Sequence, residues 1–171
     1  MSAWVFDAVR ATHTHEEAID GALVIAMTVG RLSRLADVAS FDANAFLFDL
    51  SPHCRTMEMR SRIMQAARLL DDETTDEEVV SLLGNGVRTS ESVPTALYAA
   101  MRYAEDPEEA VVRAIGYGGD TDTIAAMTGA MVGALHGAAS FPERWHAGLE
   151  RGEAGYDVLC DLSAALAKIS E

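Results

Sequence analysis

Cysteine, aromatic residues and basic side chains are scarce in this chain of 171 residues. The two cysteines, Cys54 and Cys160, are too few for a disulfide framework, so we expect both to be reduced thiols. Lys and Arg total 13 against 27 Asp and Glu, which gives a formal net charge of −14. Because nucleic-acid phosphates bind to Lys and Arg, this composition argues against nucleic acid as a partner.

The sequence also has no leader and no apolar run of membrane-spanning length. No basic-then-apolar segment opens the chain, and we therefore expect a cytoplasmic protein. The apolar segment Ile124 to Gly137 is too short to span a bilayer and is closely flanked by charge, so we expect no membrane association. The apolar fraction of 49% is still enough for a real core, and the length predicts one domain, residues 1–171.

Period-2 alternation and internal repeats are missing as well, whereas helical periodicity recurs along the chain. Ser92 and Pro94 are expected to start one helix. Three pairs have the spacing of a helix cap: Thr14 with Glu17, Thr75 with Glu78, and Ser140 with Glu143. The pattern predicts an all-α, orthogonal multi-helix bundle with short loops. The expected helices cover residues 4–11, 14–36, 42–50, 55–70, 76–83, 92–103, 107–117, 124–137 and 154–169, with a short one around Trp145.

Four oxygen-bearing side chains follow a pair of glycines directly before the apolar segment. Asp120 and Asp122 are anionic oxygen donors two residues apart in a turn, and Thr123 adds a neutral oxygen. Hard oxygen ligands of this kind are those that Mg²⁺ or Ca²⁺ prefers. The alternative is that Asp and Thr at a helix start are ordinary caps. The residues alone leave both interpretations open.

A second glycine-rich loop, Gly84-Asn85-Gly86, ends another predicted helix. A C-cap explains one glycine, but it does not require two glycines that flank an asparagine. Glycine also allows the backbone to approach a ligand closely. Elsewhere, His13 and His15 precede a helix, where two histidines without a third ligand favour capping and surface hydrogen bonding over metal binding.

Residues 118–137 closely resemble the carboxy-terminal signature of the ADP-ribosylglycohydrolase family, and residues 11–22, and 84–87 followed by 91–96, agree with it in order and spacing. The resemblance implies an all-helical fold, a pair of Mg²⁺ ions, and cleavage of the N- or O-glycosidic bond from ADP-ribose to a protein side chain or small acceptor. The partners would be an ADP-ribosylated protein or an ADP-ribose-containing small molecule. The implied metal ligands are Asp120, Asp122 and Thr123, and the implied substrate-binding residues are His13, Gly86 and Val87.

The sequence also departs from this family in its length and in the segments that it lacks. Family members are much longer, and their amino-terminal half carries a Thr-Asp-Asp segment, a Gly-rich loop and an acidic catalytic residue. No Thr-Asp-Asp occurs here, because the pair Asp71-Asp72 follows Leu70. The chain therefore resembles the carboxy-terminal half of an enzyme, and we assign no catalytic residue. It would be a truncated product, one half of a split enzyme, or a descendant that no longer catalyses.

Two functions are compatible with these residues. One is Mg²⁺-dependent hydrolysis of ADP-ribose linkages by an incomplete or split enzyme. The other is a non-catalytic helical interaction module with a residual cation site. In either case, the face that should meet the amino-terminal half would be apolar and exposed, so the expected partner is that half or a second copy of this chain.

Overall fold

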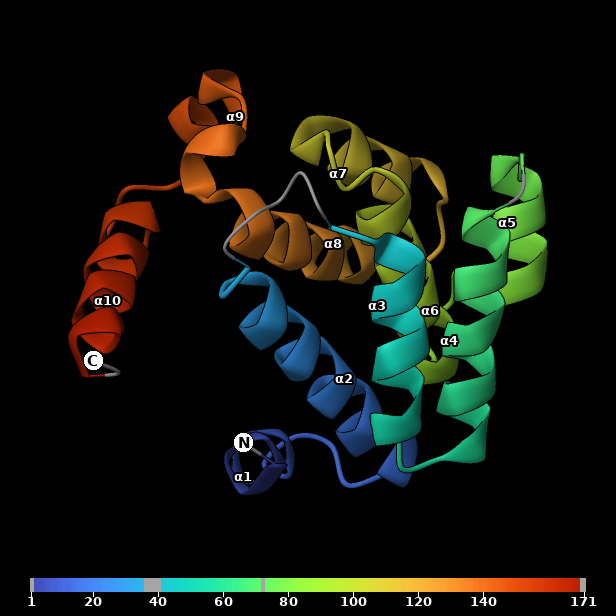
Figure 1. Ribbon diagram of the computed structural model, residues 1–171. Helices are drawn as coiled ribbons and strands as arrows, with labels where there is room; N and C mark the ends of the chain where they lie inside the picture. The colour runs from blue at the N-terminus through green and yellow to red at the C-terminus, as the bar shows by residue number, and fades with distance from the viewer. Residues whose placement is uncertain (1, 36–40, 72, 170–171) are drawn as a thin grey trace. The chain divides into compact units, whose positions relative to one another are not determined.

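The computed structural model describes residues 2–35, 41–71 and 73–169, and in these residues all regular elements are helical (Figure 1). The predicted all-α class is therefore confirmed. The chain divides into two compact units, Met1–Ser140 and Phe141–Glu171. The first contains α1 (Ser2–Val9), α2 (Glu16–Leu32), α3 (Ala43–Leu50), α4 (Met57–Leu70), α5 (Asp76–Leu83), α6 (Thr89–Arg102), α7 (Pro107–Gly116) and α8 (Thr121–His136), with short 3₁₀ turns at Ser51–His53 and Ala138–Ser140.

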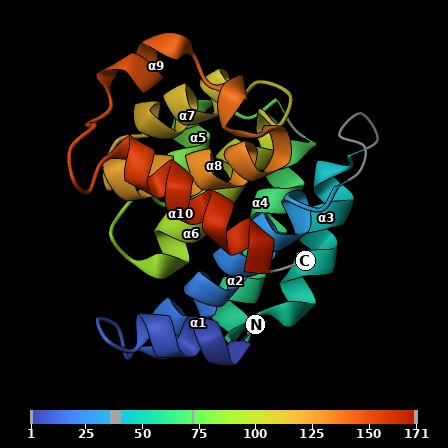
Figure 2. The same ribbon diagram turned by 90° about the vertical axis from the view of Figure 1, so that its left-hand side faces the viewer.

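Helix α6 is the central element of the first unit. It packs against α2, α4, α5, α7 and α8, and all residues from Ser92 to Met101 are buried. This burial follows from a segment of mostly small and aliphatic residues, which lets several helices approach at once. Figure 1 shows α3 and α4 running side by side, with α8 lying across their direction, and Figure 2 shows α1 below α2. In the described ranges, every helix is too short or too polar to cross a bilayer.

Several predicted helices form where the sequence places them. Helix α5 has the predicted bounds, and Thr75 and Glu78 form the complete capping box. Asp106 caps α7, whose first residue is Pro107. In α4, Met59, Ile63 and Ala66 are fully buried, whereas Leu70 at the end of the helix is half-buried. These helices share strong local start signals, which act independently of the rest of the fold.

The start of α2 differs from the prediction. The helix begins at Glu16, and its N-cap is His15, whose Nδ1 accepts a hydrogen bond from the Glu17 backbone N–H at 3.3 Å. The predicted capping box of Thr14 with Glu17 is therefore wrong, because the histidine ring takes the acceptor role one residue later. The described helix ends at Leu32, and the predicted end near Ala36 lies outside the described residues.

Two further helix starts also need correction. Helix α6 begins at Thr89, so Pro94 lies inside the helix and not in its first turn. The predicted cap of α9 (Glu143–Gly148) by Ser140 is wrong, because the Ser140 hydroxyl donates to the Gly137 carbonyl at 2.7 Å. The N-cap of α9 is Pro142, which makes no side-chain capping bond. Ser140 thus stabilises the end of α8, whose C-cap is Gly137.

The N-cap of α4 is Thr56, whose hydroxyl oxygen accepts the Met59 N–H at 3.2 Å, and the residues just before the helix are held by a carboxylate from a different helix. Asp20 on α2 is fully buried, and its carboxylate accepts bonds from the Arg55 N–H at 2.9 Å, the Thr56 N–H at 2.8 Å and the Thr56 hydroxyl at 2.7 Å. Neighbouring Cys54 is also buried. Burial, and secondly the charge of Asp20, raises the pKa of the Cys54 thiol to about 11, so the thiol is protonated at neutral pH.

The second unit consists of α9 (Glu143–Gly148) and α10 (Tyr156–Ile169). Arg151 links them: its guanidinium donates to the Asp157 carboxylate at 2.7 Å and to the His146 carbonyl at 3.3 Å. Helix α10 is amphipathic as predicted, but Leu159, Leu162 and Leu166 on its apolar face are exposed.

Candidate functional site

A cavity of about 850 Å³ in the first unit contains four of the six predicted site residues: His13, Val87, Asp120 and Thr123. These residues come from three distant parts of the sequence: the α1–α2 connection, the segment before α6, and the start of α8. The rest of the lining is mostly apolar and comes from α1, α2, α6 and α8: Val5, Ala8, Val9, Ala18, Gly21, Ala22, Ile25, Ala26, Val29, Thr89, Ser92, Val93 and Met127. Apolar walls with a few convergent polar groups are typical of small-molecule sites.

The start of α8 presents an acidic side chain to this cavity. Asp120 is the N-cap residue, yet its side chain makes no capping hydrogen bond. Its carboxylate instead accepts a bond from the Thr123 hydroxyl at 2.9 Å. The ordinary-cap interpretation therefore does not describe Asp120. Since the Thr123 proton points at Asp120, the lone pairs of the Thr123 oxygen remain available to a ligand.

The turn before Asp120 depends on two glycines in the left-handed region. Gly118 has a φ of 69° and Gly119 a φ of 66°. A Cβ atom on Gly119 would lie 2.0 Å from the Asn85 carbonyl oxygen. The turn is therefore open only to glycine at this position, because a side chain would be both strained and in collision with backbone.

The two glycine-rich loops of the sequence are joined to each other. The Asp120 backbone N–H donates to the Asn85 carbonyl at 2.7 Å, and the Asn85 side-chain amide donates to the Tyr117 carbonyl at 2.7 Å. On its other side the 84–86 loop is tied to α6, because Glu91 accepts the Gly86 N–H at 3.0 Å and the Thr95 hydroxyl donates to the Gly84 carbonyl at 2.6 Å. These bonds place Val87, which is 83% exposed, at the wall of the cavity.

His13 enters the cavity from the connection between α1 and α2. Its Nδ1 lies 2.8 Å from the Thr12 hydroxyl oxygen, which fixes the orientation of the ring. The ring nitrogen left for a ligand is therefore Nε2. His15 has a separate role as the cap of α2, so the two histidines do not form a pair.

Asp122 and Gly86 are not among the described residues that line the cavity. Asp122 is exposed in the first turn of α8, and a Cβ atom on Gly86 would meet the Glu91 carboxylate at 2.5 Å. Among the residues with described placement, no group of three or more His, Cys, Asp or Glu side chains could hold a metal ion. Two carboxylates and a hydroxyl suit an oxygen-preferring cation in type, but they fill only part of the coordination shell of Mg²⁺.

Asn85 and Glu91 are the residues near the site that the sequence did not identify. Both are connectors: they contact the loops that carry the site and do not line the cavity. The only sequence signal for Asn85 is its place between two glycines. Glu91 has no such signal, because an acidic residue in a first helical turn is common on any exposed helix.

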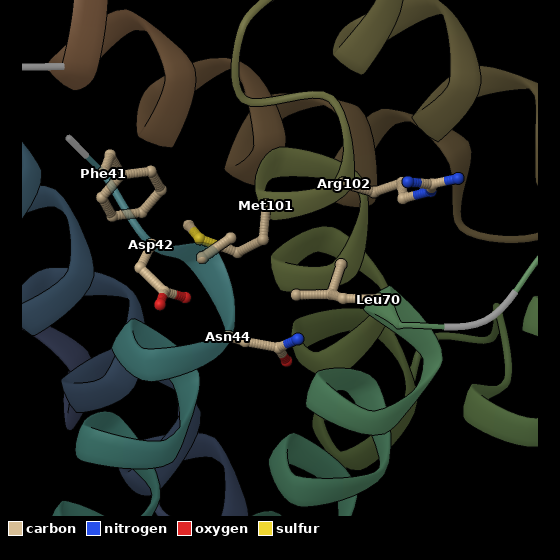
Figure 3. A pocket seen from close by; sticks show the side chains of 7 residues that line it. Phe41, Asp42, Asn44, Leu70, Met101 and Arg102 are labelled. Carbon is tan, nitrogen blue, oxygen red and sulfur yellow. The ribbon is translucent and has the colours of Figure 1, made fainter. Parts of the chain in front are cut away.

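A second cavity of about 380 Å³ lies where α3 begins and α4 and α6 end (Figure 3). Its lining residues are Phe41, Asp42, Ala43, Asn44, Leu70, Met101 and Arg102, none of which is a predicted site residue. Arg102 supplies the only cationic side chain among these, and Figure 3 shows it pointing away from Phe41 and Asp42. The cavity at α8 is therefore the candidate site.

Comparisons with known proteins bear on the family of this chain. The family model described as ADP-ribosylglycohydrolase matches residues 2–171. The chain is 34% identical to ADP-ribosylhydrolase ARH3 of Bos taurus and 33% identical to the same protein of Homo sapiens, and each alignment covers 94% of this chain and 50% of the relative. An uncharacterized protein of Archaeoglobus fulgidus is 33% identical over 82% of this chain and 44% of its own length.

The chain thus spans about half the length of the curated relatives that it matches. The family model nevertheless covers nearly every residue, including the two glycine-rich loops and the acidic start of α8 that border the cavity. This chain belongs to the ADP-ribosylglycohydrolase family.

Proposed function

We propose that this chain forms part of a Mg²⁺-dependent ADP-ribosylhydrolase, which cleaves the glycosidic bond from ADP-ribose to a protein side chain or small acceptor. The observation that carries the proposal is the cavity at α8, where His13, Val87, Asp120 and Thr123 converge from separate segments. Its volume of about 850 Å³ is within the range of small-molecule sites, about 300–1,000 Å³. Membership of the family supports the same reaction class.

In this proposal, Asp120, Asp122 and Thr123 would hold Mg²⁺. The ion would polarise ribose oxygens and lower the pKa of a bound water, which is the chemistry needed for attack at the anomeric carbon. Asp120 and Thr123 are already hydrogen-bonded to each other, so they act as one preformed edge of such a site. The remaining ligands would be water, ADP-ribose oxygens or groups from protein outside this chain.

The other residues would orient the sugar. His13, held through Nδ1 by Thr12, would offer Nε2 to ADP-ribose, while Val87 would provide an apolar contact. Gly86 would let the backbone approach the ribose. We assign no residue of this chain as the catalytic acid or base. Turnover would therefore depend on a group supplied by the rest of a family-length protein.

A second candidate function is a non-catalytic interaction module with a residual cation site. The observation that favours it is α10, where Leu159, Leu162 and Leu166 are exposed along one face of an amphipathic helix. Contiguous apolar surface of this kind is typical of contacts with another protein or a second copy of the same chain.

Thermal unfolding with and without millimolar Mg²⁺ tests the metal site. At a Mg²⁺ concentration about ten times the Kd, binding to the folded state raises the melting temperature by about 3–5 °C. We expect Asp122→Ala to abolish this rise. Glu77→Ala is the matched control, since it also removes an exposed carboxylate from the first turn of a helix, α5, away from the cavity.

The control variant should keep the full rise of the unmodified chain. A melting temperature of the unmodified chain that does not respond to Mg²⁺ contradicts the metal site. If Glu77→Ala and Asp122→Ala lose the Mg²⁺-dependent rise in melting temperature equally, the rise comes from general screening of the negative charge and not from a specific site.

A further inference from the structure

We propose that Asn85 is a positioning residue of the site: it sets the place of Asp120 at the cavity by holding the 84–86 loop and the 117–120 turn together. Asn85 itself does not line the cavity, so its effect on a ligand passes through Asp120. The relevance to ADP-ribose rests on the proposed function, whereas the positioning of Asp120 rests on the contacts alone.

The contact between the two loops uses both the backbone and the side chain of Asn85. Its carbonyl accepts the Asp120 backbone N–H at 2.7 Å, and its side-chain amide donates to the Tyr117 carbonyl at 2.7 Å. The two bonds reach the turn on either side of Gly118 and Gly119. Because the turn is held at both ends, the direction in which Asp120 leaves it is determined by Asn85.

Close packing strengthens this link. A Cβ atom on Gly119 would lie 2.0 Å from the Asn85 carbonyl oxygen and 2.7 Å from its Cγ. The turn therefore lies directly on Asn85, with no room for a side chain or a water molecule between them. A small shift of Asn85 would displace the turn and with it the Asp120 carboxylate.

Asn85 is in turn anchored to the most buried helix of the unit. Glu91 and Thr95 on α6 bind the loop on both sides of Asn85, through the Gly86 N–H at 3.0 Å and the Gly84 carbonyl at 2.6 Å. A Cβ atom on Gly84 would come within 2.6 Å of Glu91, so this contact is also tight. The chain of contacts thus runs from the core helix through Asn85 to Asp120.

The chemistry of the contact requires an asparagine. The acceptor on Tyr117 is a backbone carbonyl, which needs an N–H donor at the reach of a short side chain. Asp has the same shape but no donor, and it would turn a carboxylate oxygen towards the carbonyl. Ala removes the donor and leaves a gap. Asn85→Asp therefore isolates the hydrogen bond at nearly constant volume.

Amide hydrogen exchange of the full chain tests the positioning directly. In Asn85→Asp and Asn85→Ala we expect exchange at the Asp120 amide to become about three- to tenfold faster, as follows from losing one hydrogen bond that holds the turn. Asn44→Ala is the matched control, because the Asn44 amide also donates to one acceptor, Asp71, at the second cavity. It should leave Asp120 exchange unchanged. Asn85→Asp keeps the side-chain volume and decides the test if Asn85→Ala does not fold.

Binding of ADP-ribose in millimolar MgCl₂ tests the consequence for the site. We expect the Kd to rise about tenfold in Asn85→Asp and to stay unchanged in Asn44→Ala, at comparable losses of melting temperature. If the unmodified chain binds no ADP-ribose, the proposed function fails, and the exchange experiment still decides the role of Asn85. Unchanged Asp120 exchange in both Asn85 variants would overturn the proposal, as would a lower melting temperature with no change in exchange or in Kd.

Discussion

At the scale of single residues, a glycine in this site leaves the space of a side chain to the backbone of a neighbouring loop. Gly119 has a positive φ, and the space where its Cβ would stand is taken by the Asn85 carbonyl. Gly116 lies only three residues earlier, but nothing lies within 4 Å of its would-be Cβ. The two glycines therefore differ in function, although Gly116 ends α7 and Gly119 lies in the turn that follows it.

This difference predicts that the same substitution, glycine to alanine, changes the free energy of unfolding strongly at Gly119 and weakly at Gly116. Gly119→Ala should lower the free energy of unfolding by at least about 3 kcal/mol, because the side chain is strained at positive φ and collides with backbone. Gly116→Ala should change it by no more than about 1 kcal/mol, since alanine is favoured in a helix. Urea unfolding of both variants measures the difference. Similar values for the two would show that the 117–120 turn is not closely packed on Asn85.

At the scale of helices, the fold relies on acceptors supplied between elements as well as within them. Thr75 with Glu78 and Asp106 cap their own helices, and the sequence predicts the first of these caps. Asp20 accepts the bonds of Arg55 and Thr56, which directly precede α4 and lie more than thirty positions away in the sequence, and no local pattern reveals it. It is fully buried, so its three bonds have no substitute from water.

Asp20→Ala should therefore lower the free energy of unfolding by about 3 kcal/mol, because it leaves two backbone N–H groups and a hydroxyl without their acceptor. The control is Asp49→Ala, which removes an exposed carboxylate that pairs with Arg31 at 2.7 Å. Exposed ion pairs contribute little, so that variant should lose less than about 1 kcal/mol. Chemical denaturation measures the free energy of unfolding of both variants. An equal small decrease in both would contradict the role of Asp20 as the acceptor for Arg55 and Thr56.

The sequence predicts helix positions well where the start signal is local and strong. The prediction from sequence fails where several residues could begin a helix. His15 caps α2 in place of Thr14, and Pro94 lies inside α6. Asp120 and Thr123 are identifiable from their glycine-led turn, and the structure adds that they share a hydrogen bond and a cavity. Asn85 is not identifiable as a connector, because its partners at Tyr117 and Asp120 are brought near only by tertiary packing.

At the scale of the whole molecule, charge and length both bear on function. ADP-ribose is anionic and the chain has a formal net charge of −14, so in the proposed function a bound cation would offset the repulsion. The alignments cover about half of the curated relatives, and the described residues hold no complete metal-binding group. We therefore expect ligand binding by this chain to depend on Mg²⁺, and catalysis to be completed by protein outside this chain.

Calorimetric titration of ADP-ribose into the full chain, with and without millimolar MgCl₂, tests this claim most directly. The account predicts saturable binding that requires Mg²⁺ and is lost in Asp120→Ala, while Glu77→Ala binds as the unmodified chain does. Absence of binding under both conditions, or binding that is unaffected by Mg²⁺ and by Asp120→Ala, would contradict the account and favour the non-catalytic interaction module.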